Sequence, residues 1–316
     1  MEFLPRLWFL VGSTAAGKTA LSVELARFLG AEILSCDSVQ VYRGADIGSG
    51  KITPGEMANI PHHGLDLCGP DAAFDVRQYA EYASIIVKQM QEKRKNLLVV
   101  GGAGFYLKSF FTPVSDSIIV PENVRREVRQ LYERAGLAGL QREIAAYGPT
   151  DFNHSDWHNP RRLLNILGKQ RVVGQSQEKV KQNFMQKICP LTPFPRRVIL
   201  LERDSESLNR RIERRVEAML RGGLVDEVKF LGKMCLPLAN AIGYREVRNY
   251  LDGGQKMTPE ELKRTIVAAT LRLVKKQKMW FRKQIPIHCS ANLDARSANE
   301  SFDFIRSFCK NSGLWN

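Results

Sequence analysis

Residues 12–19 read GSTAAGKT, and this string stands between an apolar run at 7–11 and a helical pattern. Glycines in such a loop let several backbone N–H groups point at one anion at the start of a helix. Lys18 adds a cation for the outer phosphate, and the Thr19 hydroxyl is placed to hold Mg²⁺. The order of strand, loop and helix therefore predicts a diphosphate-binding loop made of Gly12, Ser13, Thr14, Ala15, Ala16, Gly17, Lys18 and Thr19.

Short apolar runs recur along the chain at 7–11, 32–36, 97–100 and 197–201. They alternate with helical patterns, which is typical of a parallel sheet covered by helices on both faces. We therefore expect an α/β fold with a P-loop NTPase-like parallel sheet. The first three runs are followed by the phosphate loop, by Asp37 and by a glycine-rich turn at 101–104. Since ligands bind at the carboxyl ends of such strands, these three loops should converge on one crevice.

The pattern changes between residues 116 and 190, where polar amphipathic helices replace the alternation and no strand is indicated. Three prolines punctuate this part, at Pro121, Pro149 and Pro160. We expect an all-helical insertion domain at 116–190 and a catalytic core built from 1–115 and 191–316. In the core, the pattern predicts a basic helix from Leu208 to Arg221 and a long helix from Pro259 to about Gln284.

The formal net charge of +14 is unevenly distributed. Residues 1–115 carry eleven basic and eleven acidic side chains, whereas 116–190 carry twelve and eight, and 191–283 carry twenty-one and eleven. An excess confined to one part of the chain suggests contact with a polyanion, and nucleic acid is the leading candidate. Ordinary solvated helix faces rich in lysine and arginine are the alternative explanation.

The hydrophobic runs and the cysteines indicate the cellular compartment that we expect for the chain. No apolar run approaches the roughly 20 residues of a membrane span, and the N-terminus does not resemble a signal peptide, so we expect a cytoplasmic protein without a membrane contact. The six cysteines include no Cys-x-x-Cys pair, which favours reduced thiols over a zinc site or a disulfide framework. A monomer is the default expectation.

Asp37 lies in the segment SCDSVQVYRGADIGSGK, residues 35–51, opposite the phosphate loop. A carboxylate at this place can bind Mg²⁺ or act as a general base, although helix capping is the alternative role for an isolated aspartate in a serine-rich turn. The strand predicted at 97–100 ends in Gly-Gly and provides no acid for the metal of a P-loop ATPase. This difference counts against an ordinary NTPase.

Taken together, these segments resemble tRNA dimethylallyltransferases. The resemblance covers most of the chain and rests on GSTAAGKTAL, DSVQVYRGADIGSGK, the histidines of PHHGLD, the turn GGAGFY, and three later segments, RRIERRVEAMLRGGLVDEV, AIGYREVRNYL and KKQKMWFRK. It implies transfer of a dimethylallyl group from dimethylallyl diphosphate to N6 of the adenine 3′ of the anticodon, position 37, in tRNAs that read codons beginning with U. The implied cofactor is Mg²⁺, and the implied partner is the anticodon stem-loop of tRNA.

The resemblance also implies roles for individual residues. Asp37 would be the general base, Thr19 would lie at the diphosphate and its Mg²⁺, and Arg211 would stabilise the departing pyrophosphate. His62 and His63 would shape the neighbouring loop. The residues implied to contact tRNA are Asp37, Ser38, Val39, Gln40, Ala103, Arg161 and Arg162.

Several positions depart from the family pattern. Ser13 stands where proline is usual and Ala103 where threonine is usual, while Asn165 and Gly168 replace an arginine and an acid of the family. Two other functions therefore stay open. One is a P-loop nucleoside or nucleotide kinase, which predicts ATP binding but leaves the basic second half of the chain unexplained. The other is a catalytically inactive relative that binds tRNA without turnover.

Overall fold

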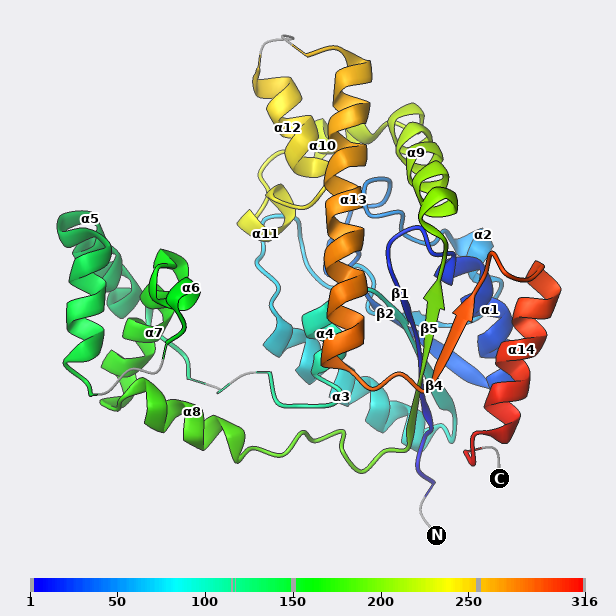
Figure 1. Ribbon diagram of the computed structural model, residues 1–316, viewed down its shortest axis with the longest axis horizontal. Helices are drawn as coiled ribbons and strands as arrows, with labels where there is room; N and C mark the ends of the chain where they lie inside the picture. Colours follow the sequence, from blue (N-terminus) through cyan, green and yellow to red (C-terminus); the bar gives the residue numbers. More distant parts are fainter. Residues whose placement is uncertain (1–2, 115, 117, 149–151, 254–256, 315–316) are drawn as a thin grey trace. The chain divides into compact units, whose positions relative to one another are not determined.

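The computed structural model describes residues 3–114, 116, 118–148, 152–253 and 257–314. The chain divides into two compact units (Figure 1). Unit 1 comprises Met1–Phe111 and Pro190–Asn316, and unit 2 comprises Thr112–Cys189.

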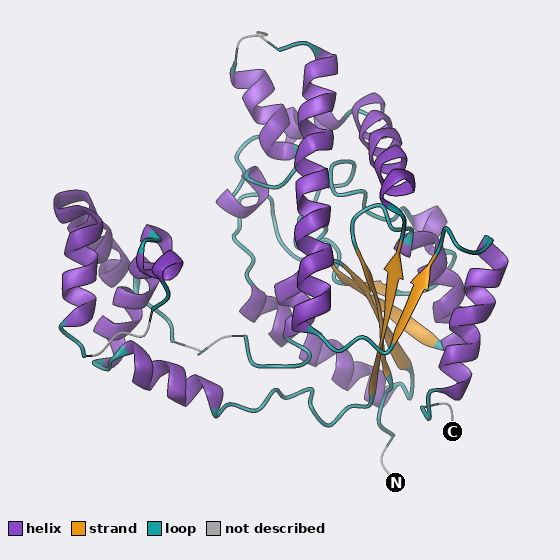
Figure 2. Cartoon of the chain, viewed as in Figure 1, coloured by secondary structure: helices purple, strands orange, loops and turns teal. Residues whose placement is uncertain are grey.

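Unit 1 is built on a β-sheet flanked by helices (Figure 2). The sheet has six strands, all paired in parallel, in the order β3-β2-β4-β1-β5-β6. Its strands are β1 (Leu7–Gly12), β2 (Ala31–Cys36), β3 (His62–His63), β4 (Asn96–Gly101), β5 (Arg196–Glu202) and β6 (Cys289–Asn292). Phe9 in the central strand pairs with Val99 on one side and with Val198 on the other. The four predicted strands are confirmed, and β3 and β6 are two further strands that the sequence did not indicate.

Helices cover both faces of this sheet, as the continuous apolar strands predict. The side chains of successive residues of β1 pack on opposite faces of the sheet. Trp8 and Leu10 belong to the apolar core that includes residues of α1 and α14, whereas the Phe9 ring lies 5.1 Å from the Phe110 ring on the opposite face. The helices of the first face are α1 (Lys18–Leu29) and α14 (Ala298–Asn311), and those of the second face are α3 (Val76–Glu92), α4 (Gly104–Lys108) and α13 (Pro259–Gln284).

The remaining helices of unit 1 gather toward the carboxyl ends of the strands (Figure 1). They are α2 (Pro54–Met57), α9 (Ser205–Arg221), α10 (Leu224–Leu231), α11 (Leu236–Ala239) and α12 (Tyr244–Asp252). The predicted basic helix corresponds to α9, which begins three residues earlier than expected. The predicted long helix is α13. Thr258 and Glu261 cap its start by hydrogen bonds to each other, and Pro259 is the first residue of the helix.

Unit 2 is helical in all the elements that the structure describes, as predicted. Its helices are α5 (Glu122–Ala145), α6 (His154–Trp157), α7 (Pro160–Val173) and α8 (Gln177–Met185). α5 is interrupted at Gly136, whose φ of 61° and ψ of −160° are not helical. The core of the unit consists of Val128, Leu140, Ile144, Leu163 and Leu167. Pro121 and Pro160 stand at helix starts, and Pro149 lies outside the described residues.

Across the described parts of both units, every helix is too short or too polar to cross a bilayer.

Candidate active site

The phosphate loop connects β1 to α1 at the carboxyl end of the sheet. Geometry requires glycine at two of its positions. A Cβ on Gly12 would lie 2.7 Å from the carbonyl oxygen of Leu201, and Gly17 has a φ of +103°. α1 begins at Lys18, directly after Gly17. The loop therefore brings backbone N–H groups to a helix N-terminus, which is the arrangement that binds phosphates.

Lys18 is folded back onto this loop. Its ammonium donates hydrogen bonds to the carbonyl oxygens of Gly12 at 2.9 Å and Ser13 at 2.8 Å. Burial lowers the pKa of Lys18 to about 8, Asp37 opposes this decrease, and Arg215 contributes to it. A bound anion would raise this pKa again, because it would favour the charged ammonium.

Two arginines hold the phosphate loop from outside. Arg211 of α9 donates from Nε to the carbonyl oxygen of Ala15 at 2.8 Å, and Arg203, just after β5, donates from Nε to the carbonyl oxygen of Ala16 at 2.9 Å. Burial lowers the pKa of Arg211, and the charge of Arg203 acts in the same direction. Cations gathered at a loop are favourable where a polyanionic ligand binds, and Asp294 offsets part of their charge through its ion pair with Arg203.

Asp37 follows β2 directly and is partly buried. One carboxylate oxygen, Oδ1, accepts the backbone N–H of Val39 at 2.9 Å, which fixes the side-chain direction. Burial lowers the pKa of both Lys18 and Arg215, and the charge of Asp37 opposes this decrease in each. Asp37 is therefore an acceptor held at the edge of a cationic region.

Two cavities of unit 1 meet at this carboxylate. The first has a volume of about 700 Å³ and the second about 500 Å³. Both cavities are lined by Thr14, Asp37, Ser49 and Arg215. The first also has polar and charged side chains, among them Lys18, Thr19, Arg211 and Arg214. The second is more apolar, and its lining includes Phe74, Val216, Ile266, Leu273 and Trp280.

The residues predicted to contact a nucleotide are divided between these cavities. Three of them line the second cavity: Ser38, Val39 and Ala103. Gln40 lines the first cavity instead. Its Oε1 accepts the Ser35 hydroxyl at 2.8 Å, and its Nε2 donates to the carbonyl oxygen of Gly50 at 3.4 Å. Gln40 thus stabilises its own loop in this structure. The convergence of the three predicted loops is confirmed, since Thr14, Asp37 and Ala103 line the same cavity.

Sequence reasoning missed two residues of this region. The side chain of Gln277 in α13 accepts a hydrogen bond from the backbone N–H of Thr14 at 2.9 Å, through Oε1. Its Nε2 donates a hydrogen bond to the carbonyl oxygen of Gly102 at 3.1 Å. Gln277 therefore connects the phosphate loop to the glycine-rich turn at 101–104. Arg215, which lines both cavities, lies four positions after Arg211. Because residues four apart share one face of a helix, that spacing was a usable signal for Arg215.

The two histidines lie in an edge strand of the sheet. They form β3, and His63 Nε2 lies 2.7 Å from Oε2 of the buried Glu32. His62 Nδ1 lies 2.8 Å from the carbonyl oxygen of Ile60. Among the described residues, no group of three or more His, Cys, Asp or Glu side chains could hold a metal ion.

Four of the residues singled out in the sequence lie on α7 of unit 2. Arg161, Arg162 and Asn165 are exposed on that helix. Gly168 is buried, and a Cβ on it would lie 3.1 Å from Cγ1 of Val120. A side chain at this position would therefore pack closely against Val120.

The matching family model is described as IPP transferase and covers residues 40–284. The chain belongs to this family. It is 40% identical to the tRNA dimethylallyltransferase of Opitutus terrae over 95% of this chain and 97% of that protein. It is 31% identical to the tRNA dimethylallyltransferase of Geobacillus kaustophilus over 88% of each chain.

Solved structures agree with this assignment. A crystal structure of the full-length tRNA isopentenylpyrophosphate transferase from Bacillus halodurans matches with a TM-score of 0.70 and 30% identity, covering 97% of this chain and 96% of that one. A eukaryotic dimethylallyltransferase described as acting on tRNA matches with a TM-score of 0.77 over 97% of this chain and 80% of that one. At 20% identity, this second likeness shows the fold alone.

Proposed function

We propose that this chain transfers a dimethylallyl group from dimethylallyl diphosphate to N6 of the adenine 3′ of the anticodon, position 37, in tRNAs that read codons beginning with U. The observation that carries the proposal is the meeting of two chemically different cavities at Asp37. A cationic cavity suits the diphosphate, and a more apolar one suits a purine and a hydrocarbon chain. The names of the relatives support the same reaction.

On the donor side, the phosphate loop, Lys18 and Arg211 bind the diphosphate, and Arg215 at the junction of the cavities stabilises the charge that develops as the diphosphate leaves. The Thr19 hydroxyl is exposed and has no hydrogen bond within the described chain, and it lines the same cavity as the Asp37 carboxylate. Hydroxyl and carboxylate oxygens are ligands that suit Mg²⁺. Thr19 would hold this ion beside the diphosphate, where it would supply further neutralisation of the leaving group.

On the acceptor side, the adenine leaves its stack and enters the second cavity. Its N6 attacks C1 of the dimethylallyl group, so the N6–C1 bond forms while the bond from C1 to the diphosphate oxygen breaks. The N6 proton passes to the Asp37 carboxylate. An aromatic amine is a weak nucleophile because its lone pair is delocalised into the ring, and a positioned base offsets part of that weakness.

Basic side chains from the segment 116–283 would hold the anticodon stem-loop through its phosphates, and we assign Arg161 and Arg162 of unit 2 to this contact. Ser38, Val39, Gln40 and Ala103 would lie at the nucleotide itself. Binding through phosphates predicts that affinity for tRNA decreases strongly with salt concentration. We further propose that the chain acts as a monomer in the cytoplasm.

Labelled dimethylallyl diphosphate, Mg²⁺ and unmodified tRNA test the proposed reaction. We expect label at the adenine 3′ of the anticodon. Asp37→Asn should lower kcat by about 10²- to 10⁴-fold, because it removes a general base while keeping the shape of the side chain. Asp71→Asn, at an exposed position of unit 1, is the matched control and should behave like the unmodified chain.

Two outcomes would favour the other functions. Phosphate transfer from ATP to a nucleoside, without transfer of the prenyl label, would support a kinase. Tight binding of the stem-loop with no incorporation of label would support an inactive relative. Turnover by Asp37→Asn at the rate of the unmodified chain would show that the base is a different residue.

A further inference from the structure

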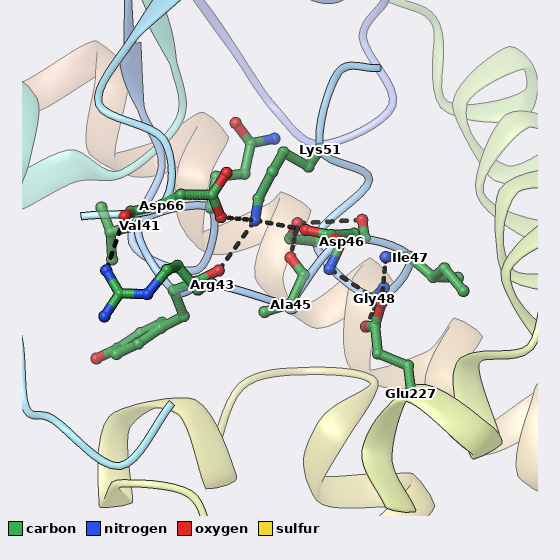
Figure 3. Close-up of polar contacts among 12 residues, drawn as sticks. Val41, Arg43, Ala45, Asp46, Ile47, Gly48, Lys51, Asp66 and Glu227 are labelled. Atoms are coloured by element: carbon green, nitrogen blue, oxygen red, sulfur yellow. Dashed lines mark hydrogen bonds and ion pairs between the residues drawn. The ribbon is translucent and has the colours of Figure 1, made fainter. Parts of the chain in front are cut away.

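The loop at residues 45–51 is held by a carboxylate from a distant helix. Glu227 of α10 accepts three consecutive backbone N–H groups, from Asp46 at 2.9 Å, Ile47 at 2.6 Å and Gly48 at 3.0 Å (Figure 3). Its Oε1 also accepts the Tyr244 hydroxyl at 2.8 Å. One ionised side chain thus satisfies four donors, and hydrogen bonds to a charged acceptor are roughly twice as strong as neutral ones.

Tyr244 fixes the same loop by contact. Its side chain is fully buried, and a Cβ on Gly48 would lie 2.6 Å from its Cζ. Burial and the neighbouring Glu227 raise the pKa of Tyr244, so its hydroxyl stays a donor. Across the loop, the buried ammonium of Lys51 contacts Asp46 Oδ1 at 2.5 Å and Asp66 Oδ1 at 2.6 Å (Figure 3). The loop is therefore held from both sides.

The part of the loop that follows reaches the point where the cavities meet. Arg215 donates from Nη2 to the carbonyl oxygen of Ser49 at 3.0 Å. A Cβ on Gly50 would lie only 2.4 Å from the same nitrogen, so the guanidinium packs directly against this backbone. Glu227 therefore fixes residues 46–48, and the next two residues of the loop contact Arg215. Arg215 and Asp37 line the same two cavities.

We propose that Glu227 is a positioning residue for prenyl transfer. It fixes residues 46–48, so that Ser49 and Gly50 keep the Arg215 guanidinium at the junction of the two cavities. This inference rests on the proposed function, in which Arg215 stabilises the leaving diphosphate. Glu227 lines neither cavity. It therefore acts through Arg215, whose proposed role is in the chemical step, and should affect the rate of that step more than donor binding.

Steady-state and single-turnover kinetics of Glu227→Gln test this role. The amide replaces one acceptor oxygen by a donor that faces other donors. We expect kcat to decrease by about tenfold or more, because one charge-stabilising group is displaced, while KM for dimethylallyl diphosphate changes less than about threefold. Asp226→Asn is the matched control. Asp226 is exposed and adjacent and its carboxylate contacts Lys229, so both constants should stay at their original values.

A double-mutant cycle separates positioning from general destabilisation. If Glu227 acts through Arg215, then Glu227→Gln should lower kcat no further in a chain that already carries Arg215→Ala. Additive losses, or a kcat for Glu227→Gln within twofold of the original, would overturn the proposal. Should Glu227→Gln fail to fold, Tyr244→Phe removes one of the four hydrogen bonds and should give a smaller decrease, about two- to fivefold, that is also absent in the Arg215→Ala chain.

Amide hydrogen exchange gives a readout that needs no substrate. In Glu227→Gln, the peptide covering residues 45–51 should exchange at least about tenfold faster, while the phosphate loop at 12–19 keeps its protection. Equal loss of protection in both peptides, or in neither, would contradict the proposal. This readout stands even if the unmodified chain transfers no prenyl group, an outcome that would refute the proposed function alone.

Discussion

Raising the pH should weaken the binding of dimethylallyl diphosphate, because Lys18 loses its charge within an accessible range. Burial, the largest cause, lowers the pKa of Lys18 to about 8. The cationic form attracts the diphosphate, so affinity is highest below this pKa and decreases as the pH rises through it. The cationic fraction decreases from about three quarters at pH 7.5 to about 3% at pH 9.5, which allows a dissociation constant up to about 25-fold larger, or about 1.9 kcal/mol.

Calorimetric titration without tRNA measures this effect directly, because the donor then binds without reacting. The Mg²⁺ concentration and the ionic strength are kept constant between pH 7.5 and 9.5. Titrations in buffers with different ionisation enthalpies should show proton uptake on binding above pH 8, since the bound anion favours the charged ammonium.

Two variants control for other titrating groups. Lys18→Arg keeps its charge over the whole range and should give a nearly flat profile. Lys18→Met should bind more weakly at every pH and also give a flat profile. An affinity of the unmodified chain that stays constant from pH 7.5 to 9.5, or a Lys18→Arg profile that declines as steeply, would refute the reasoning.

Two further predictions concern stability. Glu32→Gln should lower the free energy of unfolding by about 1–3 kcal/mol in thermal denaturation at pH 7, because it weakens a buried set of charge-assisted hydrogen bonds. Burial raises the pKa of Glu32, but hydrogen bonds from His63 and Lys95 outweigh this effect, so the pKa is lowered overall. The loss of unfolding free energy in the variant should therefore be complete above pH 4.5 and become smaller as the pH decreases below that value. Gly168→Glu should destabilise unit 2 by about 1–3 kcal/mol through overpacking against Val120, and an unchanged melting temperature would contradict this.

The central strands could be predicted from the sequence, whereas the edge strands could not. β1, β2, β4 and β5 have neighbours on both sides and helices on both faces, so their residues must be largely apolar. β3 and β6 lie at the two edges and read His-His and Cys-Ser-Ala-Asn. An edge strand pairs on one side only and tolerates polar residues, so hydrophobic pattern does not reveal it.

The position of the site was predictable for a related reason. Parallel strands bring their carboxyl ends to one edge of the sheet. The sequence alone therefore predicts that the phosphate loop, Asp37 and Ala103 lie close together. The contacts that set the geometry within the site were not predictable in this way. Gln277 bonds to Thr14 across 263 positions of the chain, and no local pattern marks a glutamine in a basic helix as a connector of two loops.

The same limit applies to Asp37 itself, because the residues that define its surroundings come from distant elements. Its own segment supplies the carboxylate and one hydrogen bond from Val39. The charge distribution around it depends on Lys18 and Arg215, and Arg215 depends in turn on a loop fixed by Glu227. Most of the cations line the first cavity, most of the apolar side chains line the second, and Arg215 lines both. In the proposed reaction, the leaving diphosphate would therefore be stabilised mainly from the first cavity, with Arg215 at the junction.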